Sequence, residues 1–319
     1  MVRLLGMTWD HPCGYDPLVG CSEIWRAESG CEVIWDGRLC ALPVDAAAQV
    51  QAWRPDLMGA PATTWEEVMA LAEAGRVLVP LRPPHSLMAF YILAANAGRP
   101  YGSKPGRPTK EAAEAAVLTR LRALVGVVDP VCFSLEPIAV LERMAAADSR
   151  IGCAPLIYGH VSCAHPGFRA RQIRFANLPI ADAAGGTLGG AGVAVSAFTR
   201  DPAAAVAVAS WLSSAKIQRG PYAAHGGQPA HRAAWRDPLL DAASGGVFSA
   251  TRRTLERAYL RPRGPHYLTF QRWAAERINE AMRGDDLPSY GLLSRERHRG
   301  CSGRRRRSMG EDRFTRRRV

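Results

Sequence analysis

The sequence lacks the signatures of the common catalytic classes. It contains no Gly-Lys-Ser/Thr phosphate loop, no His-Glu-x-x-His zinc motif and no Gly-x-Ser-x-Gly nucleophile motif. Gly189, Gly190 and Gly192 approach a dinucleotide fingerprint, but the pattern that starts at Gly190 needs a glycine where Val195 stands. We therefore interpret these glycines as positions of close backbone packing, and we expect neither enzymatic activity nor a bound cofactor.

Paired cysteines are also missing. None of the eight cysteines has a Cys-x-x-Cys partner, so neither a zinc ribbon nor a thioredoxin motif is indicated. His11 and Cys13 on one segment, and His160, Cys163 and His165 on another, have some metal-ligand character. Because the two groups lie on different segments without an acidic partner beside them, we expect these side chains to hold no metal.

The sequence has no long apolar run. No stretch approaches the ~20 apolar residues that a transmembrane helix needs. The N-terminal residues MVRLLGMTWD show neither the apolar core nor the cleavage site of a signal peptide. Eight cysteines as free thiols also count against an oxidising compartment. As written, the sequence predicts a cytoplasmic chain without a transmembrane segment.

Positive charge is abundant, but it is concentrated at one end of the chain. The formal net charge is +12, and residues 295–319 hold eleven arginines against three acidic residues, which leaves +4 for residues 1–294. Such a run is typical of phosphate-binding segments and equally of solvated, disordered extensions. We interpret residues 285–319 as a disordered arginine-rich tail without a specific nucleic-acid partner.

Strands and helices alternate along most of the 319 residues, which favours an α/β architecture. Residues 2–8 and 31–36 read as strands and residues 17–28 as a helix, and together they predict a parallel βαβ unit. Ligands of parallel sheets bind beyond the carboxyl ends of the strands. The residues in that position after the first strand are Trp9, Asp10, His11 and Tyr15.

Local signals predict the remaining elements. Further strands are expected over residues 77–81, 151–158, 173–179 and 185–195. Helices are expected over residues 65–74, 86–97, 109–125, 134–146, 203–213 and 254–283. The expected helix starts are a capping box of Thr63 with Glu66 or Thr64 with Glu67, a cap at Ser134, and a cap at Asp201 before Pro202.

Two stretches carry a resemblance to a known family. Residues 41–68 read as a crossing segment with Leu-Pro, two strand stretches and a proline-marked turn into Thr-Trp-Glu-Glu. Residues 210–235 contain Ser-x-x-x-Gln at a helix end, followed by Tyr-Ala-Ala-x-Gly-Gly-Gln-Pro-x-His. They resemble the extracellular solute-binding proteins of family 1, the maltose-binding-protein-like carbohydrate receptors of ABC importers. The resemblance covers about residues 1–36 and 41–284.

The resemblance implies a periplasmic-binding-protein-like, type II fold of two lobes with a shortened first lobe. Lobe one would take residues 1–47 and 187–245, and lobe two residues 48–186 and 246–284. The chain departs from the family between Asp36 and Ala41, where further βα units are absent. We therefore expect lobe two to be the better-ordered half, apolar surface to be exposed near Ile34, Trp35 and Leu39, and solute affinity to be weak or absent.

The implied function is non-catalytic capture of a sugar or similar small polar solute between the lobes. Its partners would be the permease subunits of an ABC transporter, and the chain would be a monomer. The expected ligand-binding residues combine aromatic rings with short polar groups, and they are Trp9, Asp10, His11, Tyr15, Asp45, Gln49, Tyr158, Gly190, Tyr222 and Gln228. Family membership would place the chain in the periplasm. This conflicts with the N-terminal residues as written, which show no signal peptide.

Two other functional classes remain open at this point. One is a cytosolic α/β enzyme without a recognised motif. The other is a nucleic-acid-binding protein that works through its basic tail, for which salt-sensitive retention on heparin would be the sign.

Overall fold

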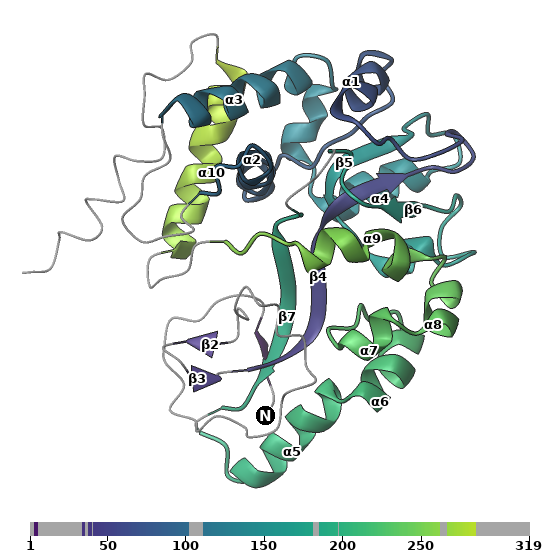
Figure 1. The fold of residues 1–319 in the computed structure, drawn as a ribbon, viewed down its shortest axis with the longest axis vertical. Helices are drawn as coiled ribbons and strands as arrows, with labels where there is room; N and C mark the ends of the chain where they lie inside the picture. The colour runs from purple at the N-terminus through teal and green to yellow at the C-terminus, as the bar shows by residue number, and fades with distance from the viewer. Residues whose placement is uncertain are drawn as a thin grey trace, which may run out of the picture.

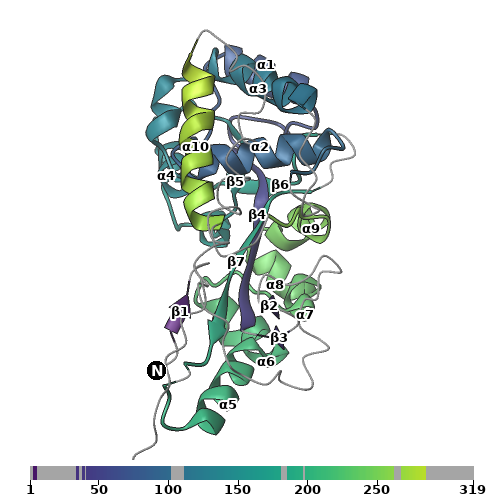
Figure 2. The same cartoon turned by 90° about the vertical axis from the view of Figure 1, so that its left-hand side faces the viewer.

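The computed structural model of the chain describes residues 3–5, 34–35, 38–39, 41–101, 111–180, 185–196, 198–261 and 267–284. The molecule divides into two parts, and two long strands, β4 (Leu42–Trp53) and β7 (Leu188–Ala194), run from one part into the other (Figure 1). Figure 2 shows the same elongated arrangement from the side, with α10 (Tyr267–Arg283) at one end and α5 (Pro202–Ser213) at the other.

The main sheet has the strand order β1-β7-β4-β5, with β6 also beside β4, and all of these neighbours are antiparallel. The bounds of its shorter strands are β1 (Arg3–Leu5), β5 (Cys153–Tyr158) and β6 (Arg174–Ala176). A separate hairpin pairs β2 (Ile34–Trp35) with β3 (Arg38–Leu39).

This pairing corrects one prediction. Strands β1 and β2 lie in different sheets, so the parallel pair predicted for residues 2–8 and 31–36 is wrong. The sequence carries the reason: Asp36-Gly37, between β2 and β3, is a dipeptide that favours a two-residue hairpin turn. A local hairpin closes a much shorter loop than a crossover connection does. The helix predicted for residues 17–28 lies outside the described residues.

Helices surround the sheet in both parts of the molecule. The first group is α1 (Trp65–Glu73), α2 (His85–Asn96), α3 (Glu111–Val125) and α4 (Pro137–Ala145), with short 3-10 helices at Pro130–Ser134 and Val161–Ala164. The helices later in the chain are α5, α6 (Ala215–Ile217), a π-type turn (Gln218–Tyr222), α7 (Arg232–Trp235), α8 (Pro238–Ala243), α9 (Val247–Glu256) and α10. Of these, α9 and α10 share a hydrophobic cluster with α1 to α4. Helices α2, α3 and α10 pack against one another.

The two parts have very different cores. The large part is built on one extended hydrophobic cluster that takes in α1 to α4, α9, α10, β5 and the second half of β4. The small part is built on a cluster of only four buried side chains among the described residues, from β4, β7 and α5: Leu42, Val44, Val193 and Ala209. Strand β4 contributes to both clusters and so ties them together. The predicted lobe boundaries at residues 47 and 187 stay a prediction.

Helix starts follow the expected signals in two cases. Thr64 accepts a hydrogen bond from the Glu67 N–H at 3.2 Å, and the Glu67 carboxylate accepts one from the Thr64 N–H at 3.4 Å, which confirms the capping box at α1. Asp201 accepts a hydrogen bond from the Ala204 N–H at 2.9 Å, which confirms the predicted cap of α5.

Two predicted helices differ from the structure. The helix expected from Ser134 begins at Pro137, because proline favours the first helical position and forces extended backbone on Glu136 before it. The long helix expected over residues 254–283 is two helices, α9 and α10. Pro262 and Pro265 stand between them in the sequence, and proline cannot donate an intrahelical hydrogen bond.

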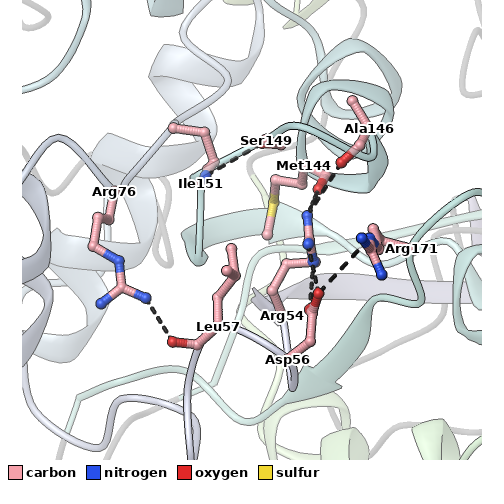
Figure 3. Close-up of polar contacts among 9 residues, drawn as sticks. All are labelled: Arg54, Asp56, Leu57, Arg76, Met144, Ala146, Ser149, Ile151 and Arg171. Carbon is pink, nitrogen blue, oxygen red and sulfur yellow. Dashed lines mark hydrogen bonds and ion pairs between the residues drawn. The ribbon is translucent and has the colours of Figure 1, made fainter.

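The buried side chain of Arg54, just after β4, is hydrogen-bonded to the C-terminal end of α4 (Figure 3). The Arg54 side chain, 1% exposed, donates to both carboxylate oxygens of Asp56 at 2.7 Å. It also donates to the carbonyl oxygens of Met144 and Ala146 at the C-terminus of α4. These carbonyls carry the negative end of the helix dipole, so the guanidinium both caps α4 and stabilises its own burial.

Within the described ranges, no helix combines the length and the apolar character needed to cross a membrane.

Candidate functional site

Six of the ten predicted site residues lie in the described part of the chain. Trp9, Asp10, His11 and Tyr15 lie outside it, so their role stays a prediction. Asp45 and Gln49 lie on β4, Tyr158 and Gly190 lie on the strands paired with it, Gln228 is hydrogen-bonded to it, and Tyr222 is close enough to sense the Asp45 charge.

The register of β4 sets the spacing of the site. Side chains two apart share one face of a strand, so Asp45, Ala47 and Gln49 face the same way over about 13 Å. In the neighbouring strands, Gly190 of β7 stands opposite Ala46, and Tyr158 of β5 stands opposite Gln49. The sheet therefore brings residues more than a hundred positions apart in sequence to one stretch of β4.

Glycines in β7 make this close arrangement possible. Gly190 has a φ of +143°, and a Cβ atom there would lie 2.3 Å from the Asp45 carbonyl oxygen. A Cβ atom on Gly189 would lie 2.8 Å from the ring of Tyr158. The prediction that these two glycines serve close packing is confirmed.

Tyr158 and two histidines form one end of the site. The rings of His85, at the start of α2, and Tyr158 lie 6.2 Å apart in an edge-on arrangement. Burial lowers the pKa of His85 to about 4, and burial also lowers the pKa of His160. Both imidazoles are therefore neutral at pH 7, where each offers one hydrogen-bond donor and one acceptor.

His85 is the site residue that the sequence analysis missed, since it considered His160 only as a metal ligand. The available signal was positional: His85 opens an apolar helix directly after a predicted strand and two prolines. Nothing in the sequence places the start of this helix beside Tyr158, which lies 73 residues further along the chain. The two rings meet only because the folded chain brings the start of α2 to the end of β5.

Asp45 and the turn after the π-type helix form the other end. Asp45 forms an isolated antiparallel bridge with Pro229. The Gln228 side-chain amide donates to the Ala46 carbonyl oxygen at 2.7 Å, and the Ala46 N–H donates back to the Gln228 carbonyl oxygen at 3.4 Å. Gln228 thus anchors the turn on β4. A Cβ atom on Gly227 would lie 2.5 Å from the Tyr222 ring, so the turn also fixes Tyr222.

Electrostatics single out Asp45 within this group. Burial raises its pKa from 3.8 to about 6. Burial and the nearby Asp45 charge together raise the pKa of Tyr222 to about 12. At pH 7 the described site therefore contains one carboxylate charge beside a neutral tyrosine.

Gln49 has a different environment. Its side chain is completely buried, and its amide donates to the Leu156 carbonyl oxygen at 3.3 Å. Its backbone N–H donates to the Thr187 carbonyl oxygen at 3.3 Å. In this conformation Gln49 joins β4 to its neighbours, and its predicted contact with a ligand is untested.

The described residues contain no group of three or more His, Cys, Asp or Glu side chains that could hold a metal ion. Cys163, which lies between His160 and His165 in the sequence, is buried, and burial raises the pKa of its thiol to about 11. A protonated thiol is a poor metal ligand and a poor nucleophile.

Comparison with known proteins gives matches at the level of structure. No protein-family model and no curated protein matches the sequence. The chain superposes on maltose-bound T. maritima MalE3 with a TM-score of 0.70 and 17% identity, over 82% of this chain and 72% of that one. It superposes on the GacH receptor of Streptomyces glaucescens with a TM-score of 0.70 and 14% identity, over 93% and 78% of the two chains.

This chain has the fold of the periplasmic binding proteins. A third neighbour is a ribitol-bound ABC transporter solute-binding protein of Agrobacterium radiobacter, with a TM-score of 0.66 and 20% identity, over 87% of this chain and 74% of that one. The periplasmic-binding-protein fold confirms the predicted α/β fold class. These structural neighbours are carbohydrate-type solute-binding proteins, and the low identities make the likeness one of fold.

Proposed function

We propose that this chain is a non-catalytic receptor that captures a sugar or similar small polar solute for an ABC importer. The observation that carries the proposal is the register of β4, β5 and β7. It places Asp45 on β4, the strand that joins the two parts of the molecule, and Tyr158 of β5 opposite Gln49 of the same strand, with Tyr222 close enough to sense the Asp45 charge. A solute held there would touch both parts at once and would favour their closure.

The chemistry of these side chains suits a polyhydroxylated solute. Sugar rings offer apolar C–H faces to aromatic rings, and Tyr158 and Tyr222 supply such rings. Hydroxyl groups need short donors and acceptors, which the Asp45 carboxylate and the neutral imidazole of His85 supply. The structural neighbours, which include proteins described with maltose, ribitol and acarbose, support a solute of this class.

Permease subunits of an ABC transporter are the partners that this proposal implies. The periplasm, or the outer side of the membrane, is the corresponding location. The predicted monomer fits a receptor that opens and closes around its solute.

Thermal denaturation of the full chain with maltose, maltotetraose, ribitol and tagatose tests the proposal. A solute that binds only the folded state stabilises it by mass action, by about 2.7 kcal/mol at a hundredfold excess over Kd. We expect at least one of these solutes to raise the melting temperature. Tyr158→Ala should abolish this shift, and Leu239→Ser, at a side chain that is 81% exposed on α8, should keep it.

Two results would contradict the proposal. One is the absence of any stabilisation at millimolar solute. The other is a Tyr158→Ala variant that is folded and responds to the same solute as strongly as the unchanged chain.

A further inference from the structure

Helix α5 has an apolar face that is exposed to solvent. Its sequence, PAAAVAVASWLS, contains no charged residue. Ala204, Val208 and Trp211 have the spacing of one helix face, and all three are exposed, Val208 at 44% and Trp211 at 56%. Phe198, four residues before the helix, is 96% exposed. A helix that is apolar on every side is normally buried on every side, so this face is suited to a contact.

The opposite face of α5 already lies against the small part of the molecule. Ala209 belongs to the cluster of four buried side chains from β4, β7 and α5, and Ser213 is buried one turn further on. The Ser213 hydroxyl donates to the Ala209 carbonyl oxygen at 2.9 Å, within the helix. A part of the molecule with so small a core gains stability when association buries more of its apolar surface.

The lack of charge on α5 favours a second copy of the same chain as the partner. In a contact with two-fold symmetry the same surface meets itself, so a charged side chain near the axis would face its own like charge. Helix α5 carries no such side chain over its whole length. The small side chains of Ala204 and Ala207, both exposed, also let two helices approach closely.

The ends of α5 favour an antiparallel pair. Two antiparallel helices place the positive end of each helix dipole beside the negative end of the other. The nearest charged residues on the two sides of α5 in the sequence are Asp201 and Lys216, which have opposite signs. An antiparallel pair brings Asp201 of one copy to the same end as the partner's Lys216, so like charges do not meet there.

The position of α5 leaves room for a second copy. The helix lies at the outer edge of the small part in both views, and Figure 2 shows it at the end of the molecule opposite α10. A second copy can therefore reach α5 without passing the large part.

We propose that α5 is an interface between two copies of this chain, which pair antiparallel through Ala204, Val208 and Trp211. A helix of 12 residues is about 18 Å long, so the contact buries less than the ~800 Å² per partner of a standard interface. The dimer is therefore weak, with a dissociation constant of about 10 µM to 1 mM. The monomer predicted from the sequence is then the form present at low concentration.

Sedimentation velocity of the full chain measures this association. We expect monomer at about 5 µM and a clear shift toward dimer at about 500 µM. Trp211→Glu should fold, because Trp211 is more than half exposed, and it should raise the dissociation constant at least about tenfold. The matched control is Leu239→Ser on α8, at a side chain that is 81% exposed, and it should leave the dissociation constant unchanged.

Hydrogen exchange at the same two concentrations locates the contact without a variant. The amides of α5 should exchange more slowly at about 500 µM than at about 5 µM, by a factor that follows the fraction of dimer. The amides of α2, which lie in the large part, should exchange equally at both concentrations.

Three results would overturn the proposal. They are a chain that stays monomeric at about 500 µM, a dimer that Trp211→Glu leaves as tight as before, and an association that protects other segments but not residues 202–213. Flotation with phosphatidylglycerol vesicles covers the main alternative. A monomeric chain that binds these vesicles through Trp211 would make the α5 face a lipid-binding surface instead.

Discussion

At the scale of single residues, the described part of the fold contains one buried charge, on Arg54, that it stabilises strongly and one half-buried charge, on Asp45, that it does not. Arg54 is buried among four hydrogen-bond acceptors, the carboxylate oxygens of Asp56 and the carbonyl oxygens of Met144 and Ala146. Asp45 is half-buried, and it has no such partner in the described part of the chain. The first arrangement favours the folded state, and the partial burial of Asp45 disfavours its charged form.

Asp45→Asn should therefore stabilise the free protein at neutral and alkaline pH. The folded-state pKa of Asp45 is raised, so its favourable contribution is complete below the unfolded pKa of 3.8 and is lost as the pH rises through about 6. Removing the charge should raise the free energy of unfolding at pH 8 by about 1–3 kcal/mol. Urea denaturation at pH 8 and pH 4 checks this. A gain that is equal at both pH values, or a loss at pH 8, would contradict burial of the charge as the cause.

Arg54→Met should destabilise the large part by about 2–4 kcal/mol, because the α4 carbonyls lose their donor. The matched control is Arg169→Met, since Arg169 pairs with Glu142 at 2.6 Å but is 39% exposed, and exposed ion pairs contribute under about 1 kcal/mol. Chemical denaturation of both variants makes the comparison. Equal losses would show that Arg54 is no more important than a surface ion pair.

At the scale of elements, helix caps and strand packing can be tested separately. Thr64→Ala should cost about 1 kcal/mol of stability, because it removes the acceptor for the Glu67 N–H at the start of α1. Thr119→Ala is the matched control, since Thr119 is exposed within α3 and bonds only to the Ala115 carbonyl oxygen of its own helix among the described residues. Circular dichroism melts would show the difference. A loss at Thr119 as large as that at Thr64 would argue against the cap.

Gly190→Ala should disrupt the contact between β7 and β4. Its Cβ atom would lie 2.3 Å from the Asp45 carbonyl oxygen at a φ of +143°, a conformation that alanine rarely adopts. We expect a loss of more than about 2 kcal/mol and of solute binding. Gly59→Ala, where no atom lies within 4 Å of the added Cβ, should be nearly neutral. A stable Gly190→Ala variant that still binds solute would show that the site does not require this glycine.

The elements also show what the sequence could and could not predict. Helix α5 and strand β5 follow periodic patterns and clear caps, so their positions were predictable within a few residues. The pairing of β2 with β3 follows the Asp36-Gly37 turn signal, which the periodicity of the apolar residues does not contain. His85 was missed for a related reason, because the site forms through the approach of α2 to β5 and neither segment alone reveals it.

At the scale of the whole molecule, the contrast between the two hydrophobic clusters has a consequence. The cluster of the small part holds four buried side chains among the described residues, while Trp211 on α5 is 56% exposed and Phe198 is 96% exposed. Local stability follows buried apolar contact, so we expect the amides of α5 to exchange hydrogen at least about tenfold faster than those of α2. Hydrogen exchange on the free chain measures both. Equal protection would contradict the predicted order of stability.

Solute binding between the two parts is the central claim, and hydrogen exchange of the bound chain tests it most directly. The measurement compares the free chain with the chain saturated by the solute that stabilises it most. We predict slower exchange in segments from both parts, at residues 45–49, 156–160, 188–191 and 222–229. Protection confined to one part of the molecule, or no change in these four segments, would contradict the claim.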